Sequence, residues 1–169
     1  MKKTLTILLT CITITTSALS QESLKKVYDE NINQMTQIDE AVAKASIENK
    51  HIICQVGGNW CPWCLRFADF ISNDSTINKM VNDNFIYIHV NYNPNNTPTE
   101  ELKKSTEEML KRLKNPSRFG FPVFVVLDAN GNVLHIQDSS FLEEDNGYNK
   151  EKVLRFMGCW TRDAIKNPN

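Results

Sequence analysis

The chain has 169 residues, of which 41% are hydrophobic and 23% are charged, and its formal net charge is −1. This composition excludes a wholly disordered protein, because it supplies enough apolar side chains for a core, and the length suits one domain rather than two. The near-neutral charge offers no basic surface for nucleic acid, so we expect no nucleic-acid partner.

The first twenty residues have the pattern of a secretory signal peptide. Lys2 and Lys3 form a short positive region, an apolar run broken by threonines follows, and Ala18-Leu19-Ser20 offers small residues for cleavage. The apolar run is too short to span a bilayer well. We therefore expect residues 1–20 to be a signal peptide and the protein to be exported, periplasmic or secreted. The alternative is an N-terminal anchor that is retained.

The remaining chain divides into a polar extension at residues 21–36 and one domain at residues 37–169. Apolar periodicity, capping residues and turn residues place the elements of this domain. In chain order these are a helix capped by Thr36, a buried strand at 51–56, a helix at 65–71, a helix from an Asp74 or Ser75 cap to Val81, a strand at 85–90, a helix from a Thr99 cap to Leu113, strands at 123–127 and 132–137, and a helix ending near Trp160.

The connections between these elements predict the sheet. The strands at 51–56 and 85–90 are joined through helices and should lie parallel, whereas Asp128-Ala129-Asn130-Gly131 predicts a hairpin between the last two strands. Helices should cover both faces of the resulting mixed sheet. The sequence therefore predicts a single α/β domain.

Four cysteines remain after the predicted cleavage, and two of them form a C-x-x-C motif. An even number of cysteines in an exported protein is compatible with structural disulfides, but Cys61 and Cys64 close too short a loop to restrain the unfolded chain much. The stretch Trp60-Cys61-Pro62-Trp63-Cys64 stands where a strand and a glycine turn give way to a helix. Free amide groups and the dipole at a helix start lower the pKa of a thiol there.

This placement suits thiol–disulfide exchange, which needs one thiolate to attack and a second thiol to resolve the mixed disulfide. Cys61 is the expected nucleophile, and Cys64 lies one turn inward, within reach of its sulfur. A zinc site needs four ligands, and a covalent haem site needs a histidine where Leu65 stands. We therefore expect Cys61 and Cys64 to be catalytic, without metal or organic cofactor; a purely structural disulfide is the alternative.

The segment from Cys54 to Cys64 resembles the active-site stretch of the thioredoxin superfamily, and the segment from Gly120 to Val133 resembles the cis-proline strand and hairpin of that family. The resemblance covers about residues 37–160. It is closest to small exported bacterial thioredoxin-like proteins, the group that includes the thioredoxin-like domain of thiol-disulfide interchange proteins. It implies a thioredoxin fold, with a central mixed sheet flanked by helices on both faces.

The resemblance also implies a substrate-binding surface around the two cysteines. Pro122 would take the cis form and lie against the pair, and the backbone of Phe121 would contact a substrate peptide. Trp60 and Trp63 offer apolar surface around the reactive sulfur.

Two residues depart from thioredoxin itself. The central dipeptide is Pro62-Trp63 rather than Gly-Pro, and Gln55 stands where thioredoxin has a buried acid that helps to deprotonate the resolving cysteine. A neutral amide cannot act as a general base, so this step must use water or another group. The direction of electron flow is therefore left open.

The other cysteines and the histidines have plainer interpretations. We expect burial for Cys54 and Cys159, because a free cysteine behaves as a small hydrophobic residue; a second disulfide or a regulatory thiol is the alternative. His51, His89 and His135 stand singly at strand positions, where a structural role is expected and metal binding is the alternative.

The sequence thus predicts a monomeric extracytoplasmic oxidoreductase that exchanges disulfides with cysteine-containing client proteins and is recharged by a membrane-bound redox partner. Two alternatives belong to other classes. One is a non-catalytic thioredoxin-fold protein that binds clients through its aromatic surface. The other is a copper metallochaperone that binds the metal through Cys61 and Cys64.

Overall fold

The fold was analysed in a computed structural model that describes residues 24–95 and 99–166, so the predicted signal peptide lies outside the described residues. A four-stranded sheet has the order β2-β1-β3-β4. Strand β1 (His51–Gly57) pairs in parallel with β2 (Phe85–Asn91) and antiparallel with β3 (Val123–Leu127), and β3 pairs antiparallel with β4 (Val133–Asp138). The predicted mixed sheet, with its parallel pair and its terminal hairpin, is confirmed.

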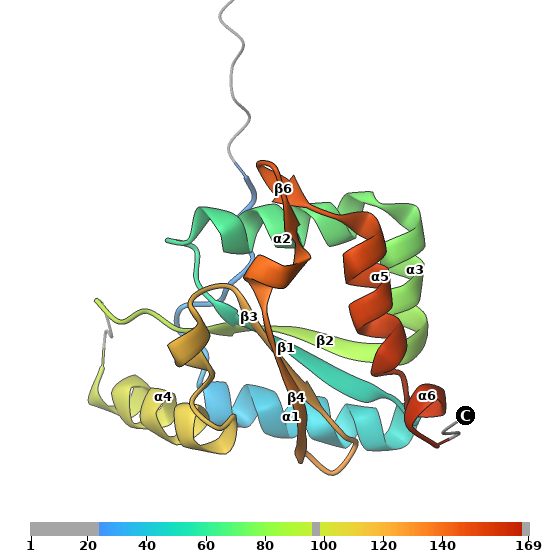
Figure 1. The fold of residues 1–169 in the computed structure, drawn as a ribbon. Coiled ribbons are helices and arrows are strands. Elements are labelled where there is room, and N and C mark those ends of the chain that lie inside the picture. Colours follow the sequence, from blue (N-terminus) through green and yellow to red (C-terminus); the bar gives the residue numbers. More distant parts are fainter. Residues whose placement is uncertain (1–23, 96–98, 167–169) are drawn as a thin grey trace, which may run out of the picture.

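Helices cover both faces of this sheet, as predicted (Figure 1). Helices α1 (Gln34–Glu48) and α4 (Glu100–Arg112) lie on one face. Helices α2 (Pro62–Asn73), α3 (Ser75–Asn84) and α5 (Lys150–Cys159) lie on the other, and the short α6 (Arg162–Lys166) follows α5. The site residues sit where β1 runs into α2, at one end of the sheet.

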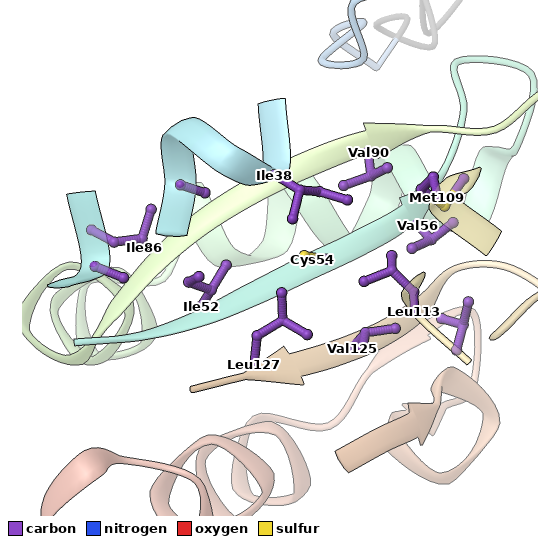
Figure 2. Packing of buried hydrophobic residues seen from close by; sticks show 13 residues of the cluster. Ile38, Ile52, Cys54, Val56, Ile86, Val90, Met109, Leu113, Val125 and Leu127 are labelled. Atoms are coloured by element: carbon purple, nitrogen blue, oxygen red, sulfur yellow. The ribbon is translucent and has the colours of Figure 1, made fainter. Parts of the chain in front are cut away.

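The core has one layer on each side of the sheet because successive strand residues point to opposite faces. Ile52, Cys54 and Val56 of β1 pack with apolar residues of α1 and α4, as Figure 2 shows. Ile53 of the same strand packs in the other layer, where the rings of Phe67 and Phe124 lie 4.4 Å apart. Residues of β1 pack in both core layers, and this packing holds the end of the central strand in a fixed position.

The first helix begins earlier than the sequence predicts. Asn33, not Thr36, is its N-cap, and the Asn33 side chain accepts the backbone N–H groups of Met35 and Thr36. The hydroxyl of Ser105 on α4 also donates to Asn33 over 3.0 Å. The Thr36 cap was wrong because this contact between two helices, which local sequence does not encode, stabilises the earlier start.

Several short elements also go beyond the prediction. These are the 3-10 helices η1 (Pro116–Phe119) and η2 (Ser139–Leu142) and a small hairpin of β5 (Glu143–Glu144) and β6 (Gly147–Tyr148). The hairpin brings Tyr148 against α2. None of the helices in the described part of the chain combines the length and apolar character that a membrane span requires.

Candidate active site

The two cysteines of the C-x-x-C motif form a disulfide at the start of α2, with their Cα atoms 5.2 Å apart. Cys61 is the N-cap residue, and its sulfur accepts the backbone N–H of Cys64 over 3.2 Å. Pro62 occupies the first turn, where a missing N–H group leaves no bond unmade. Cys61 is 5% exposed and Cys64 is fully buried, so Cys61 is the member of the pair that a substrate sulfur reaches first.

A loop with a cis peptide bond faces this disulfide. The Phe121–Pro122 bond is cis, in the form that the resemblance implies. The carbonyl oxygen of Phe121 lies 3.7 Å from the sulfur of Cys61, and Pro122 is buried. The strand that follows, β3, is hydrogen-bonded to β1, so the loop and the disulfide are held at the same end of the sheet.

Aromatic rings border the Cys61 side of the disulfide. The Trp60 ring is 44% exposed and meets the Phe121 ring edge to face at 5.5 Å. Its indole N–H donates to the backbone carbonyl of Tyr92 over 2.8 Å, and the Tyr92 ring stacks on Phe121 at 5.1 Å. These contacts fix an exposed apolar surface beside the sulfur that a substrate would approach.

Trp63 lies on another side of the pair and is held from β6. Its ring meets the Tyr148 ring edge to face at 5.6 Å, and the Tyr148 hydroxyl donates to its backbone carbonyl over 3.1 Å. The guanidinium of Arg66 lies 4.9 Å from the centre of the Trp63 ring. The structure therefore brings all six sequence-predicted site residues, Trp60, Cys61, Trp63, Cys64, Phe121 and Pro122, to one end of the sheet.

A hydrogen-bonded amide lies directly beneath Cys64. The fully buried Gln55 donates from Nε2 to the Cys64 carbonyl over 2.8 Å and to the Tyr28 hydroxyl over 2.7 Å. Its Oε1 accepts the Tyr87 hydroxyl over 2.6 Å. Where thioredoxin places a buried acid, this protein has an uncharged network of one amide and two phenols.

A largely buried histidine, His89, lies beside this network, with its Nε2 atom out of contact with solvent. The ring of His89 meets the rings of Tyr28 and Tyr87 edge to face at 5.3 and 5.4 Å, and its Nε2 makes no hydrogen bond within the described residues. Burial lowers the pKa of His89 to about 4 and raises the pKa of both phenols, so all three side chains are neutral near pH 7. The region under Cys64 therefore carries no ionised side chain from these residues.

Residues 24–33 contribute to the site in a way that the sequence analysis did not foresee. Tyr28 is only 5% exposed and packs in one cluster with Cys61 and Cys64. Asn59, in the loop before the motif, accepts the N–H groups of Val27 and Tyr28 and donates to the Tyr28 carbonyl. The sequence offers one signal of this burial, the aromatic Tyr28 within a polar stretch, and that signal does not indicate where the ring packs.

The remaining cysteines and histidines lie away from the disulfide. Cys54 is buried, as predicted, and burial raises its pKa to about 12, whereas Cys159 is exposed, contrary to the prediction, because it lies at the end of α5 with its side chain outside the core. His51 bonds the carbonyl of Trp160, and the His135 ring stacks on the Trp160 ring at 4.5 Å. Within residues 24–95 and 99–166, no three His, Cys, Asp or Glu side chains are placed to hold a metal ion.

A C-x-x-C disulfide that caps a helix and faces a cis-proline loop on this mixed sheet defines the protein as a member of the thioredoxin superfamily. Comparison with protein families gives the narrower assignment. The family Thioredox_DsbH, described as a protein of unknown function, DUF255, matches residues 16–161. The chain belongs to this family.

Individual relatives agree with this assignment. The chain is 28% identical over 78 residues to the disulfide bond reductase DsbH of Chlamydia pneumoniae, a match that covers 46% of this chain and 45% of that protein. The chain therefore matches about half the length of this curated relative. Its fold is similar to the disulphide isomerase from Xylella fastidiosa Temecula1, with a TM-score of 0.66 and 18% identity over 80% of this chain and 97% of that one. A DsbH oxidoreductase structure gives a TM-score of 0.53 and 23% identity over 76% of this chain and 81% of that one.

Proposed function

We propose that this protein is an extracytoplasmic thiol–disulfide oxidoreductase that acts on cysteine-containing proteins. The observation that carries the proposal is the Cys61–Cys64 disulfide at the N-terminus of α2, where Cys61 keeps 5% exposure and Cys64 is fully buried behind it. The helix start favours the thiolate of Cys61 in the reduced protein, and the geometry lets Cys64 displace whatever sulfur Cys61 has captured.

The reaction is proposed to run in the reducing direction, in line with the name of the curated relative. The Cys61 thiolate attacks a client disulfide, forms a mixed disulfide and releases one client sulfur as a thiolate that takes a proton from solvent. The Cys64 thiolate then attacks the Cys61 sulfur, the Cys61–Cys64 bond forms, and the second client sulfur leaves and is protonated. The client gains two electrons and the pair loses two.

The client would lie across the aromatic surface beside Cys61. Trp60, Trp63 and Phe121 are proposed to hold apolar parts of the client chain, and Pro122 to position the Phe121 backbone as a hydrogen-bonding partner. Tryptophan and phenylalanine provide large contact areas at low conformational cost, which suits the binding of varied clients.

Residues 1–20 are proposed to be the signal peptide that places this activity outside the cytoplasm. Cytosolic reductants do not cross the membrane, so a membrane-bound redox partner is proposed to reduce the pair after each cycle. The protein is proposed to act as a monomer.

The test is reduction of insulin by a dithiol, followed as turbidity when the released chains aggregate. The wild-type protein should accelerate the reaction, and the Cys61→Ser and Cys64→Ser variants should not. The Cys54→Ala variant is the matched control, because Cys54 is a core residue on the far side of β1. The reduction potential of the pair tests the direction: a reductase should lie near thioredoxin, at about −270 mV, and a value near −120 mV would mark an oxidant instead.

The two alternatives from other classes predict different results. A client-binding protein would keep its affinity for unfolded or reduced proteins in this variant and would show no insulin reduction in the wild type. A copper metallochaperone would bind Cu(I) through Cys61 and Cys64 in an anaerobic titration of the reduced protein. The position of Cys61 as the N-cap of α2, with Cys64 buried behind it, favours the oxidoreductase over both.

A further inference from the structure

The orientation of the buried Gln55 amide can be derived from its partners. The backbone carbonyl of Cys64 can only accept a hydrogen bond, so the Gln55 atom 2.8 Å from it must be the amide nitrogen. The amide oxygen then faces Tyr87, whose hydroxyl donates to it over 2.6 Å. Every donor and acceptor direction of the amide near Cys64 is thereby determined.

This orientation decides what the Tyr28 hydroxyl does. The second hydrogen of the Gln55 amide nitrogen points at the Tyr28 oxygen, 2.7 Å away, so Tyr28 is an acceptor toward Gln55. Its own hydroxyl proton must therefore point elsewhere. A hydroxyl has one donor, and leaving it unpaired in a buried site costs free energy.

The sulfur of Cys64 borders the same point in space. A Cβ atom on Gly57 would collide with the Cys64 sulfur and would lie 3.0 Å from the Tyr28 oxygen. The Tyr28 ring also packs in one cluster with Cys61 and Cys64. Glycine at position 57 thus leaves the Tyr28 hydroxyl and the Cys64 sulfur at the border of one space that holds no side chain of residue 57.

We propose that the Tyr28 hydroxyl donates a hydrogen bond to the sulfur of Cys64 and stabilises its thiolate when this cysteine resolves the mixed disulfide. This inference rests on the proposed function. In that step the Cys64 thiol releases its proton to water, its thiolate attacks the Cys61 sulfur, and the client sulfur leaves with the electron pair and is protonated by solvent. Tyr28 neither gains nor loses a proton overall.

The step needs such a donor because Cys64 is fully buried and burial disfavours the thiolate. Gln55 cannot take the proton, and the side chains around it offer no charge to compensate. The titratable groups that face this region from β2, β6 and the N-terminal segment are Tyr87, His89, Tyr148 and Tyr28, whereas Cys54 lies on the other face of β1. Two charged groups contact the neighbouring loop and helix: Glu30 accepts a hydrogen bond from Asn59, and Arg66 lies over the Trp63 ring. Burial raises the pKa of Tyr28, so its hydroxyl keeps the proton that it donates.

The reaction of the reduced protein with 5,5′-dithiobis(2-nitrobenzoate) separates the two steps. The Cys61 thiolate releases a first coloured thiolate and forms a mixed disulfide, and Cys64 then releases the second. A full-length background in which Cys11 and Cys159 are serine removes the other accessible thiols, since Cys54 is buried. The pH dependence of the second phase gives the pKa of Cys64 in the mixed disulfide.

In Tyr28→Phe the first phase should be unchanged, and the pKa from the second phase should rise by about one unit or more, because a hydrogen bond to a charged group is lost. Below that pKa the second phase should slow by about threefold for each unit, since a less acidic thiolate is also more nucleophilic and offsets part of the loss. Tyr87→Phe is the matched control: it removes the other phenol on the same amide and should leave the second phase within about twofold of wild type.

The proposal would be overturned if the second-phase pKa of Tyr28→Phe equalled that of the wild type. It would also be overturned if the pKa rose equally in Tyr87→Phe, because the effect would then come from the Gln55 amide rather than from the hydroxyl–sulfur contact. A 3-fluorotyrosine at position 28 keeps both bonds of the network and is a stronger donor, so it should lower the second-phase pKa. The proposed function fails separately, if wild-type protein reduces no insulin, because the two phases with the aryl disulfide are measured without any protein substrate.

Discussion

The side chain of Asn59 binds the backbone of Tyr28 in both directions. Its Oδ1 accepts the Tyr28 N–H over 3.1 Å, and its Nδ2 donates to the Tyr28 carbonyl over 2.8 Å, in the manner of a neighbouring strand. Asn59 precedes Cys61 by two residues, so the loop that leads into the cysteine pair also holds the segment that packs the Tyr28 ring against Cys61 and Cys64.

Asn59→Ala should destabilise the protein by about 2 kcal/mol, because it leaves the backbone groups of Val27 and Tyr28 without partners. Hydrogen exchange should increase in residues 24–33 before it increases in the sheet. Urea unfolding and exchange detected by mass spectrometry measure the two effects. Asn73→Ala is the control: its side chain bonds only the exposed Asp69 on the same helix, so a change within about 0.5 kcal/mol is expected. Equal losses in both variants would contradict the special role of Asn59.

Stability should fall on acidification because of His89. Its pKa is lowered from 6.5 to about 4 by burial, so the unfolded chain takes up a proton in a range where the folded protein does not. The stabilising effect is complete above pH 6.5 and is lost as the pH falls toward 4, by about 2 kcal/mol at pH 5. His89→Phe keeps the edge contacts with the two tyrosines. Its free energy of unfolding, measured by thermal or urea unfolding, should change less between pH 7 and pH 5 than that of the wild type. An unchanged pH dependence in this variant would refute the assignment.

The two remaining cysteines should differ sharply in reactivity. The experiment uses protein without residues 1–20 and with the Cys61–Cys64 disulfide intact. Under native conditions an alkylating reagent should modify one thiol, that of Cys159. Cys54 should react only after unfolding, because it is buried in the core and its pKa is raised to about 12. Mass spectrometry of alkylated peptides identifies each site. Rapid native labelling of Cys54 would show that the layer formed by α1 and α4 opens readily.

Trp60→Ala should weaken the use of protein substrates far more than the use of small disulfides. In the proposed function the exposed Trp60 ring provides client contact area, and it carries no group that takes part in sulfur exchange. We expect kcat/KM for insulin to fall by about tenfold, equivalent to about 1.4 kcal/mol, with little change for a small aryl disulfide. Ile47→Ala truncates a residue that is 86% exposed on α1, on the other face of the sheet, and should change neither rate. Equal effects on both substrates would place Trp60 in the chemistry rather than in binding.

Much of the fold follows from local patterns. The buried strand before Gly57, the hairpin at Asp128 and the helix after Cys61 were predicted from apolar runs and turn residues, and all three are present. Capping was less reliable: Asn33 and Thr36 are both good capping residues, and the hydroxyl of Ser105 decides between them. Apolar periodicity predicts which face of a helix is buried, but it does not predict hydrogen bonds from a helix that is distant in the sequence.

By itself the sequence determined where the cysteine pair of the proposed chemistry lies, because Cys61, Pro62 and Cys64 are neighbours in the chain and the helix start beside them is local. Only the tertiary structure decided what lies beneath. Tyr28 is 27 residues from Gln55, Tyr87 is 32 residues from it, and their hydroxyls meet one amide only because the N-terminal segment and β2 pack against β1. These contacts form because buried polar groups need hydrogen-bond partners. This need produces no repeating pattern of residues from which the partners could be predicted.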